Sequence, residues 1–197
     1  QQTAGAGAYY TPPALDGSRP GMFFVNLRDV SANPLWGMKT LAYHEGIPGH
    51  HLQTTVALRQ RDLPLVRRLG WYPAYGEGWA LYAERLAADI GVYEKDPLGD
   101  LGRLQAELMR AVRLVVDTGM HAKGWSRAQA VNFFVERNGS KPAEVESEVD
   151  RYCSWPGQAT GYKLGNSRIV SGGGTQDQTT WGIFASADWH FADTLTF

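Results

Sequence analysis

One short segment of the chain gathers the residue types that bind metal ions. His44, Glu45, His50 and His51 lie within eight consecutive positions, and they include three of the five histidines of the chain. Neutral imidazole nitrogen and carboxylate oxygen are usual ligands of zinc, and an acid beside a ligand can serve as a general base toward water on the metal. The segment therefore predicts a zinc site in which Glu45 acts as the base.

The spacing of these histidines departs from a simple helical pair. In the His-Glu-x-x-His motif of zinc proteases the second histidine follows the first by four residues, whereas here His50 follows His44 by six. On an unbroken helix His44 and His51 would share a face but lie roughly 10 Å apart along the axis, too far for one ion. Because Pro48 and the nearby glycines interrupt a helix, we expect a kink. The kink brings His50, or alternatively His51, level with His44; the simpler alternative is a helix end with histidines at a turn.

A third ligand is expected from a second helix. Glu77 lies between two glycines and Glu84 follows it by seven residues, so both project from the same side of a helix. Glu77 is the candidate ligand, and Glu84 is expected behind the ligands or paired with Arg85 or another base. The alternative is that Glu77 only complements the dipole at a helix start.

Four motifs, taken together, resemble a bacterial protein family. They are AYHEGIPGHHLQ, YGEGWALYAERL, an arginine-rich helix ending in VVDTGMH, and YCSWPGQATGYKLG. With the opening AYYTPPALDGSRPGMFFVNL, they resemble the C-terminal catalytic part of domain-of-unknown-function family eight-eight-five over residues 5–165. That family is similar in outline to the mostly helical gluzincin zinc peptidases. Its members are commonly far longer, with a helical N-terminal part that this chain lacks.

This resemblance implies roles for individual residues. The implied roles belong to six residues: the zinc ligands His44, His50 and Glu77, the base Glu45, and the oxyanion donors Tyr162 and His121. The implied reaction is zinc-dependent hydrolysis of peptide bonds in short peptides. In this reaction Glu45 accepts a proton from water, and the two donors stabilise the tetrahedral intermediate.

The residues themselves support the two oxyanion donors only in part. His121 ends a long apolar helix, and Asp117 lies one turn earlier on the same face, where a carboxylate can orient an imidazole. A histidine at that place can equally complement the helix dipole. Tyr162 can equally be a buried structural tyrosine.

Two arginines on the same long helix have two possible roles. Arg110 and Arg113 are three residues apart on one face, where they can bind a substrate carboxylate or pair with acids such as Glu107 and Asp117. We favour the structural role.

Length and composition restrict the function classes. A chain of 197 residues with 43% hydrophobic residues can form one domain with a real core. The 19 basic and 20 acidic residues nearly cancel, so binding of nucleic acid or of an anionic membrane has no electrostatic support. The single cysteine, Cys153, excludes an internal disulfide. Neither a membrane span nor a signal peptide is visible, while the resemblance favours a periplasmic or secreted location. The oligomeric state is not predicted.

The expected fold class is mainly α, with a short strand near the N-terminus and a strand-like C-terminal tail. The first 20 residues are expected to be irregular because of their prolines, and residues 21–27 are expected to form the strand. Ser126 and Gln129 predict a capping box. The helices are expected over residues 35–45, 49–60, 73–90, 97–120, 126–137 and 141–152, with a last one from residue 156.

The end of the chain differs in character from the rest. We expect a catalytic domain over residues 1–165 and an atypical tail over 166–197, in which residues 166–168 lead into a flexible glycine-rich break at 171–175. WGIFASADWHFADTLTF resembles a strand and turn of TonB-dependent outer-membrane receptors. We therefore predict a foreign fusion or a junction of reading frames, with His190 away from the metal.

Three function classes follow from these patterns. The leading one is the zinc peptidase. The second is a truncated metal-binding remnant without catalysis, and the third, suggested by the tail alone, is a piece of an outer-membrane receptor.

Overall fold

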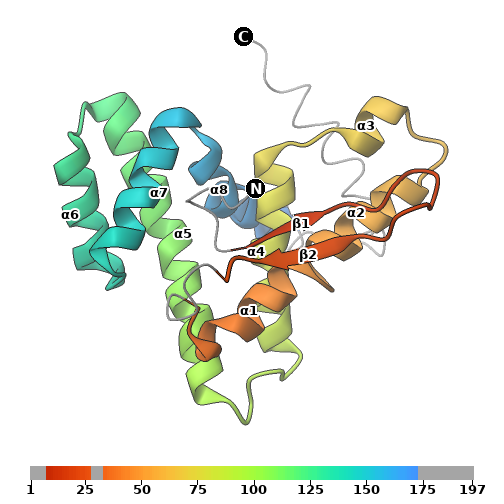
Figure 1. The fold of residues 1–197 in the computed structure, drawn as a ribbon, viewed down its shortest axis with the longest axis horizontal. Helices are drawn as coiled ribbons and strands as arrows, with labels where there is room; N and C mark the ends of the chain where they lie inside the picture. The colour runs from red at the N-terminus through yellow and green to blue at the C-terminus, as the bar shows by residue number, and fades with distance from the viewer. Residues whose placement is uncertain (1–7, 28–32, 173–197) are drawn as a thin grey trace.

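The protein is mainly helical, with a small sheet near its N-terminus (Figure 1). The computed structural model describes residues 8–27 and 33–172. The predicted fold class is confirmed for this part of the chain. The predicted tail strands, the junction hypothesis and His190 lie outside the described residues. No helix of the described part is both long and apolar enough to cross a membrane.

The sheet is an antiparallel hairpin of two strands. β1 (Ala8–Thr11) pairs with β2 (Met22–Val25), and Tyr9 lies opposite Phe24 with the two rings stacked 4.9 Å apart. The predicted strand is confirmed as β2. The prediction of an irregular opening is wrong for β1, because its aromatic residues gain a cross-strand partner that the local sequence does not reveal.

Eight helices fill most of the described chain. They are α1 (Leu35–Glu45), α2 (His50–Arg59), α3 (Leu65–Leu69), α4 (Pro73–Asp89), α5 (Pro97–Lys123), α6 (Arg127–Asn138), α7 (Pro142–Ser154) and α8 (Gln158–Gly172). Prolines open α4, α5 and α7, where a missing amide proton costs no hydrogen bond. Gly124 and Gly139 end α5 and α6 in the left-handed region, at φ 67° and 71°. The short α3 was not predicted.

The predicted capping box of α6 is confirmed. The Ser126 side chain accepts a hydrogen bond from the Gln129 backbone, and the Gln129 side chain accepts one from the Ser126 backbone. Both bonds satisfy amide groups that the first turn of a helix leaves free. The start of α6 is thus a local property of its sequence.

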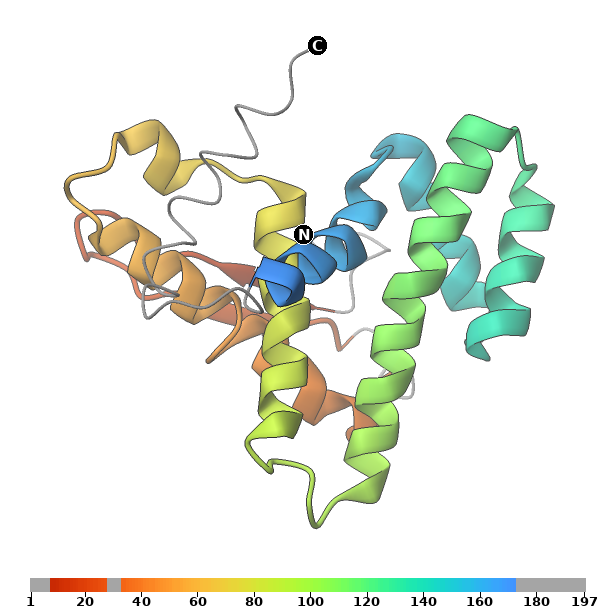
Figure 2. The ribbon, with the colours of Figure 1, turned by 180° about the vertical axis from the view of Figure 1, so that it is seen from behind.

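The last helix, α8, packs closely against α4 (Figure 2). A Cβ atom at Gly165 would lie 1.8 Å from the Ala74 carbonyl oxygen, and one at Gly78 would lie 2.6 Å from the Gly165 backbone. Only glycines permit this approach. α8 therefore continues past the predicted end of the domain at residue 165 and into the first two residues of the predicted break, because packing against α4 stabilises it.

The hydrophobic core lies at one side of the molecule. It consists of buried side chains from α5, α6, α7 and the start of α8: Val112, Val116, Ala130, Val131, Phe134, Val145, Val149, Tyr152 and Ala159. The other half of α5 lies beside α1, α4 and α8. That second region buries apolar residues of α4, such as Trp79 and Leu81, together with polar and charged side chains, and the predicted site residues lie there.

Candidate metal centre

The two predicted histidine ligands come from the two sides of a sharp turn. α1 ends at Glu45 and α2 begins at His50. A Cβ atom at Gly49 would lie only 1.8 Å from the carbonyl oxygen of His44, so glycine alone lets the chain fold back this closely. The Trp79 indole of α4 donates a hydrogen bond of 2.8 Å to the Pro48 carbonyl and holds the turn. The predicted kink is confirmed as a complete break between two helices.

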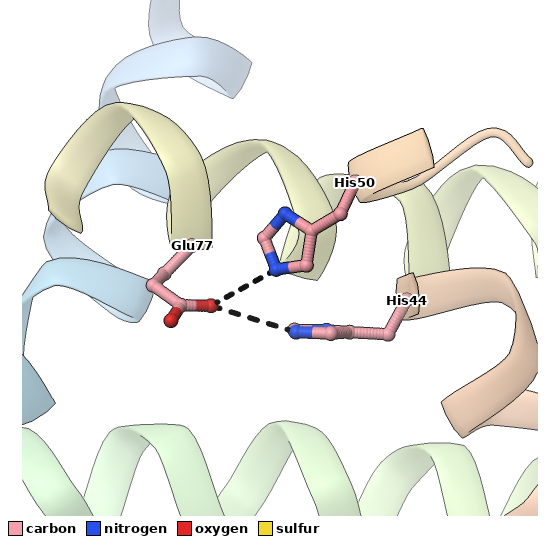
Figure 3. A group of neighbouring side chains, drawn as sticks. All are labelled: His44, His50 and Glu77. Carbon is pink, nitrogen blue, oxygen red and sulfur yellow. Dashed lines mark ion pairs between the residues drawn. The ribbon is translucent and has the colours of Figure 1, made fainter. Parts of the chain in front are cut away.

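Three side chains converge at this turn (Figure 3). Glu77 Oε2 lies 3.5 Å from His44 Nε2 and 3.3 Å from His50 Nε2, and one ligand atom from each residue lies within 4.8 Å of the others. A tetrahedral zinc ion with bonds of about 2.0–2.1 Å needs ligand atoms about 3.3–3.4 Å apart. The two distances to Glu77 match this spacing. The three side chains therefore form a donor set of the kind that holds a metal ion.

His51, the alternative second ligand, is directed elsewhere. Its Nδ1 forms a hydrogen bond of 2.8 Å with the Tyr10 hydroxyl of β1. His51 thus connects the hairpin to α2, while His50 belongs to the metal-binding group. Of the two candidates, the structure brings His50 into this group and directs His51 to Tyr10.

His44 is oriented by an acid behind it, as expected for a metal ligand. Its Nδ1 donates a hydrogen bond of 2.7 Å to Glu84, whose carboxylate also pairs with Arg110 at 2.9 Å. A carboxylate on Nδ1 keeps the proton there and leaves Nε2 free to bind a metal. Arg85, the other expected partner of Glu84, instead pairs with Asp89.

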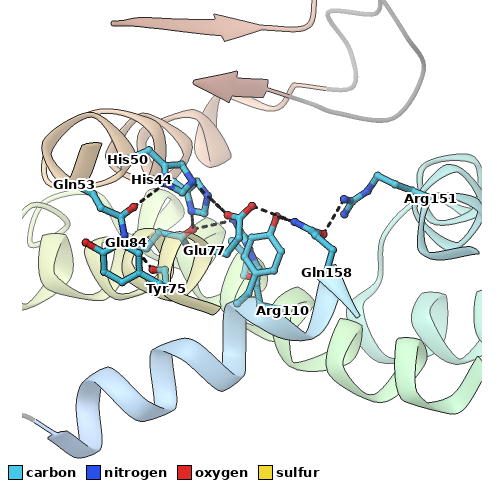
Figure 4. A network of polar contacts seen from close by, with 11 residues as sticks. His44, His50, Gln53, Tyr75, Glu77, Glu84, Arg110, Arg151 and Gln158 are labelled. Carbon is cyan, nitrogen blue, oxygen red and sulfur yellow. Dashed lines mark hydrogen bonds and ion pairs between the residues drawn. The ribbon is translucent and has the colours of Figure 1, made fainter. Parts of the chain in front are cut away.

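His50 is oriented by an amide. Its Nδ1 donates to Gln53 Oε1 at 3.4 Å, and Gln53 Nε2 donates to the Tyr75 carbonyl at 3.1 Å (Figure 4). The Trp71 ring packs against His50 at 5.4 Å between ring centres. Gln53 therefore fixes the imidazole and connects α2 to α4.

Glu77 and Tyr162 share one partner on α8. Gln158 Nε2 donates to Glu77 Oε1 at 3.1 Å and to the Tyr162 hydroxyl at 3.3 Å. The Tyr162 ring stacks over the His44 ring with 6.2 Å between their centres. Tyr162 thus lies at the site, as its predicted role requires.

Glu45 is buried beside the three ligands with one oxygen unused. Its Oε2 has no hydrogen-bond partner. Burial raises the pKa of Glu45, although the neighbouring imidazoles of His44 and His50 act in the opposite direction. A buried carboxylate with a raised pKa and a free oxygen can accept a proton and release it again.

The three predicted ligands interact strongly with one another. Burial acts to lower the pKa of His44, but hydrogen bonds to Glu77 and Glu84 outweigh it and raise this pKa to about 9. Burial acts to raise the pKa of Glu77, but the two imidazoles outweigh it and hold this pKa well below its usual range. A proton on His44 therefore occupies the position that a metal ion would take.

A comparison with known families agrees with the motifs. The profile described as "Bacterial protein of unknown function (DUF885)" matches residues 1–174. The chain belongs to this family. The match extends past residue 165, where we expected the domain to end. It gives no support to the resemblance of the tail to TonB-dependent receptors.

A solved structure similar to this chain extends the comparison. The crystal structure of the "putative lipoprotein" from Colwellia psychrerythraea is 56% identical to this chain, with a TM-score of 0.84 over 86% of it. The chain spans only 29% of the length of that solved protein. No curated protein matches.

One predicted residue of this DUF885 chain lies apart from the metal-binding group. His121 is exposed, and its Nε2 bonds to the Tyr152 carbonyl at 3.1 Å. Asp117, expected to orient His121, instead accepts hydrogen bonds from the Gly157 backbone at 3.1 and 3.2 Å. The prediction of an Asp117–His121 pair is wrong, because a loop amide supplies the partner of the acid.

The two arginines have structural partners, although not those expected. Arg110 pairs with Glu84, and Arg113 pairs with Glu148 at 2.7 Å. Both guanidinium groups also lie over the Tyr162 ring, at 5.7 and 4.9 Å from its centre, which is favourable for a cation beside an aromatic face. The two arginines therefore support Glu84 and the Tyr162 ring rather than a substrate.

Sequence reasoning missed the two glutamines that contact the site. Gln53 and Gln158 are buried and each bonds to a predicted ligand. Glutamine has no intrinsic preference for such a position, so the motifs contain no signal that marks them. Only their place on α2 and α8 beside the ligands reveals their role.

Proposed function

We propose that this chain binds Zn²⁺ through His44, His50 and Glu77 and hydrolyses peptide bonds in short peptides. The observation that supports this proposal is the convergence of three buried ligand atoms within 4.8 Å of one another beside the unpartnered Glu45 oxygen. Zinc bound by three protein ligands lowers the pKa of a water molecule and polarises a carbonyl group. The remaining chemistry falls to the side chains of the site.

Glu45 is the proposed general base. Its free Oε2 accepts the proton of the attacking water and then delivers it to the leaving amine. The raised pKa of Glu45 favours holding that proton between the two steps. Glu84 and Gln53 keep Nε2 of each imidazole directed at the metal position.

Tyr162 is the proposed donor to the substrate carbonyl oxygen. Burial raises the pKa of its hydroxyl, and the negative charge of Glu77 acts in the same direction, so the group stays protonated at neutral pH. A fixed donor of this kind is strongest where negative charge develops in the transition state. His121, with its exposed position and its bond to the Tyr152 carbonyl, has no part in the proposed site.

One observation favours a second candidate function. Because the chain spans 29% of the solved relative, residues supplied from elsewhere in a longer protein can be required for catalysis. The alternative is a metal-binding part without hydrolytic activity of its own. We also propose an extracytoplasmic location, since that relative is described as a lipoprotein.

Metal analysis and peptide hydrolysis on two proteins test the proposal. We expect the wild-type chain to bind one zinc ion and cleave short peptides. We expect Glu45→Gln to bind zinc equally but to lose at least about 100-fold in turnover, as loss of a general base does. Zinc binding without turnover in both proteins would favour the non-catalytic alternative. Absence of zinc binding by the folded wild type would overturn both.

A further inference from the structure

Gln158 lies between the metal-binding group and the proposed oxyanion donor. It is 4% exposed, and its single amide nitrogen donates to both Glu77 Oε1 and the Tyr162 hydroxyl. Gln158 and Tyr162 are one turn apart on α8 and so share a face. The close glycine contacts between α8 and α4 bring this face against Glu77.

The orientation of the Gln158 amide is determined by a neighbour. Arg151 donates a hydrogen bond of 2.9 Å to Gln158 Oε1 (Figure 4). Since an arginine can only donate, Oε1 must face it and Nε2 must face the site. Arg151 is itself held by Glu148, which also pairs with Arg113. A chain of charged contacts from α5 and α7 thus prevents the amide from turning over.

We propose that Gln158 is a positioning residue that directs Glu77 Oε2 to the metal and the Tyr162 proton to the substrate. This inference rests on the proposed metal site. Its first half follows from the two oxygens of Glu77: Oε1 accepts the amide proton of Gln158, whereas Oε2 faces the Nε2 atoms of His44 and His50 at 3.5 and 3.3 Å. The carboxylate then binds a metal through one oxygen.

The second half follows from the chemistry of the Tyr162 hydroxyl. An amide nitrogen can only donate, so the phenol oxygen accepts from Gln158 and its own proton remains available for another acceptor. The Tyr162 ring is fixed by His44 on one side and by the two arginines. With the ring fixed, the hydroxyl proton can still rotate about the C–O bond, and the hydrogen bond from Gln158 restricts this rotation.

Metal binding by Gln158→Met tests the first half. Methionine has a similar length but no amide, and Gln105→Met is the matched control, because the Gln105 amide donates to the Asn138 carbonyl rather than to a predicted ligand. We expect about 10–100-fold weaker Zn²⁺ binding for Gln158→Met only, as for other residues that orient a ligand. Metal affinity is measured by competition with a chromophoric chelator.

Cobalt spectra give a readout that loss of stability would not change. We expect Co²⁺ bound to Gln158→Met to show weaker visible absorption than in the wild type, because Glu77 becomes free to bind through both oxygens and the coordination number rises. The control should keep the wild-type spectrum. If wild type binds metal but Gln158→Met leaves both affinity and spectrum unchanged, the inference fails while the proposed metal site stands.

A double-mutant cycle with Tyr162→Phe tests the second half. If Gln158 acts on turnover through the Tyr162 proton, the fold-decrease in kcat of the double variant should be smaller than the product of the two single fold-decreases. The loss of metal affinity from Gln158→Met should persist in the Tyr162→Phe background. Fully multiplicative effects on kcat would overturn this half, and a metal-free wild type would overturn the whole.

Discussion

Two adjacent faces of the long helix α5 bury different kinds of side chain. One face packs into an apolar cluster that includes Val116, Phe134 and Val149. The next face buries Arg110, Arg113 and Asp117, and Arg110 pairs with Glu84 beside His44. Apolar burial stabilises the first region directly, whereas burial of charges costs free energy that only their partners recover. We infer that the first region stabilises the fold and that the second is arranged for the proposed metal ion.

The largest effect that we expect is a loss of stability from a substitution in the apolar region alone. Phe134→Ala removes a side chain that is 1% exposed, and we expect unfolding to cost about 3–5 kcal/mol less. The zinc affinity of the molecules that remain folded should be unchanged, because Phe134 touches no ligand. Urea denaturation and chelator competition measure the two quantities. A large change in affinity would show that the two regions are not independent.

The second prediction concerns how the free energy of unfolding depends on pH, which we expect to report on the polar region and not on the apolar one. The pKa of His44 is about 9 in the folded, metal-free protein against an ordinary value of 6.5. Its stabilisation is therefore complete below pH 6.5 and is lost as the pH rises through 9, by roughly 3 kcal/mol in all. Urea denaturation across this range, with a chelator present, measures the loss.

Two variants serve as comparisons in the pH experiment. Phe134→Ala should show the same loss from a lower starting stability, and His44→Gln should not show it. Since metal binding requires neutral His44, zinc affinity should rise over the same interval. A metal-free wild type whose stability does not change between pH 6.5 and 9.5 would contradict the coupling of His44 to Glu77 and Glu84.

A single added methyl group at Gly49 should disrupt the arrangement of His44 and His50. Gly49→Ala places a Cβ atom 1.8 Å from the His44 carbonyl oxygen, so the turn must move and separate His44 from His50. We expect overpacking to cost about 1–3 kcal/mol of stability and zinc binding to weaken about 100-fold. Gly37→Ala is the control, since its nearest neighbour lies 4.0 Å away. Equal zinc affinity in both variants would exclude the proposed role of the turn.

The smallest effect concerns the support of His44. Glu84→Gln keeps an acceptor for Nδ1 but removes the charge shared with Arg110, and we expect about 10-fold weaker zinc binding. Asp89→Asn is the matched control, because the Asp89–Arg85 pair is exposed and such pairs contribute about 0–1 kcal/mol. Isothermal titration with zinc compares the two. Similar affinities would mean that the carboxylate only packs against the imidazole.

Local patterns in the sequence were sufficient for most of the helices, although not for α3 or the end of α8, and for the residue types of the site. Prolines and the Ser126–Gln129 box mark helix starts because capping depends on residues only three positions apart. The histidine spacing and Pro48 together predicted a break, since an unbroken helix cannot bring those imidazoles to one ion. Glu77 and Glu84 were predicted on one side of a helix from periodicity alone.

The tertiary structure alone decided which partners those residues have. The choice of His50 over His51 depends on Tyr10 of the hairpin, 41 positions away from His51. Gln158 bonds to Glu77, which lies 81 positions earlier in the chain. α8 continues past Gly165 because the absence of a Cβ atom at this glycine lets α4 pack directly against it. Periodicity and capping act within a few residues of the chain, whereas these contacts depend on how whole helices pack, which no local pattern contains.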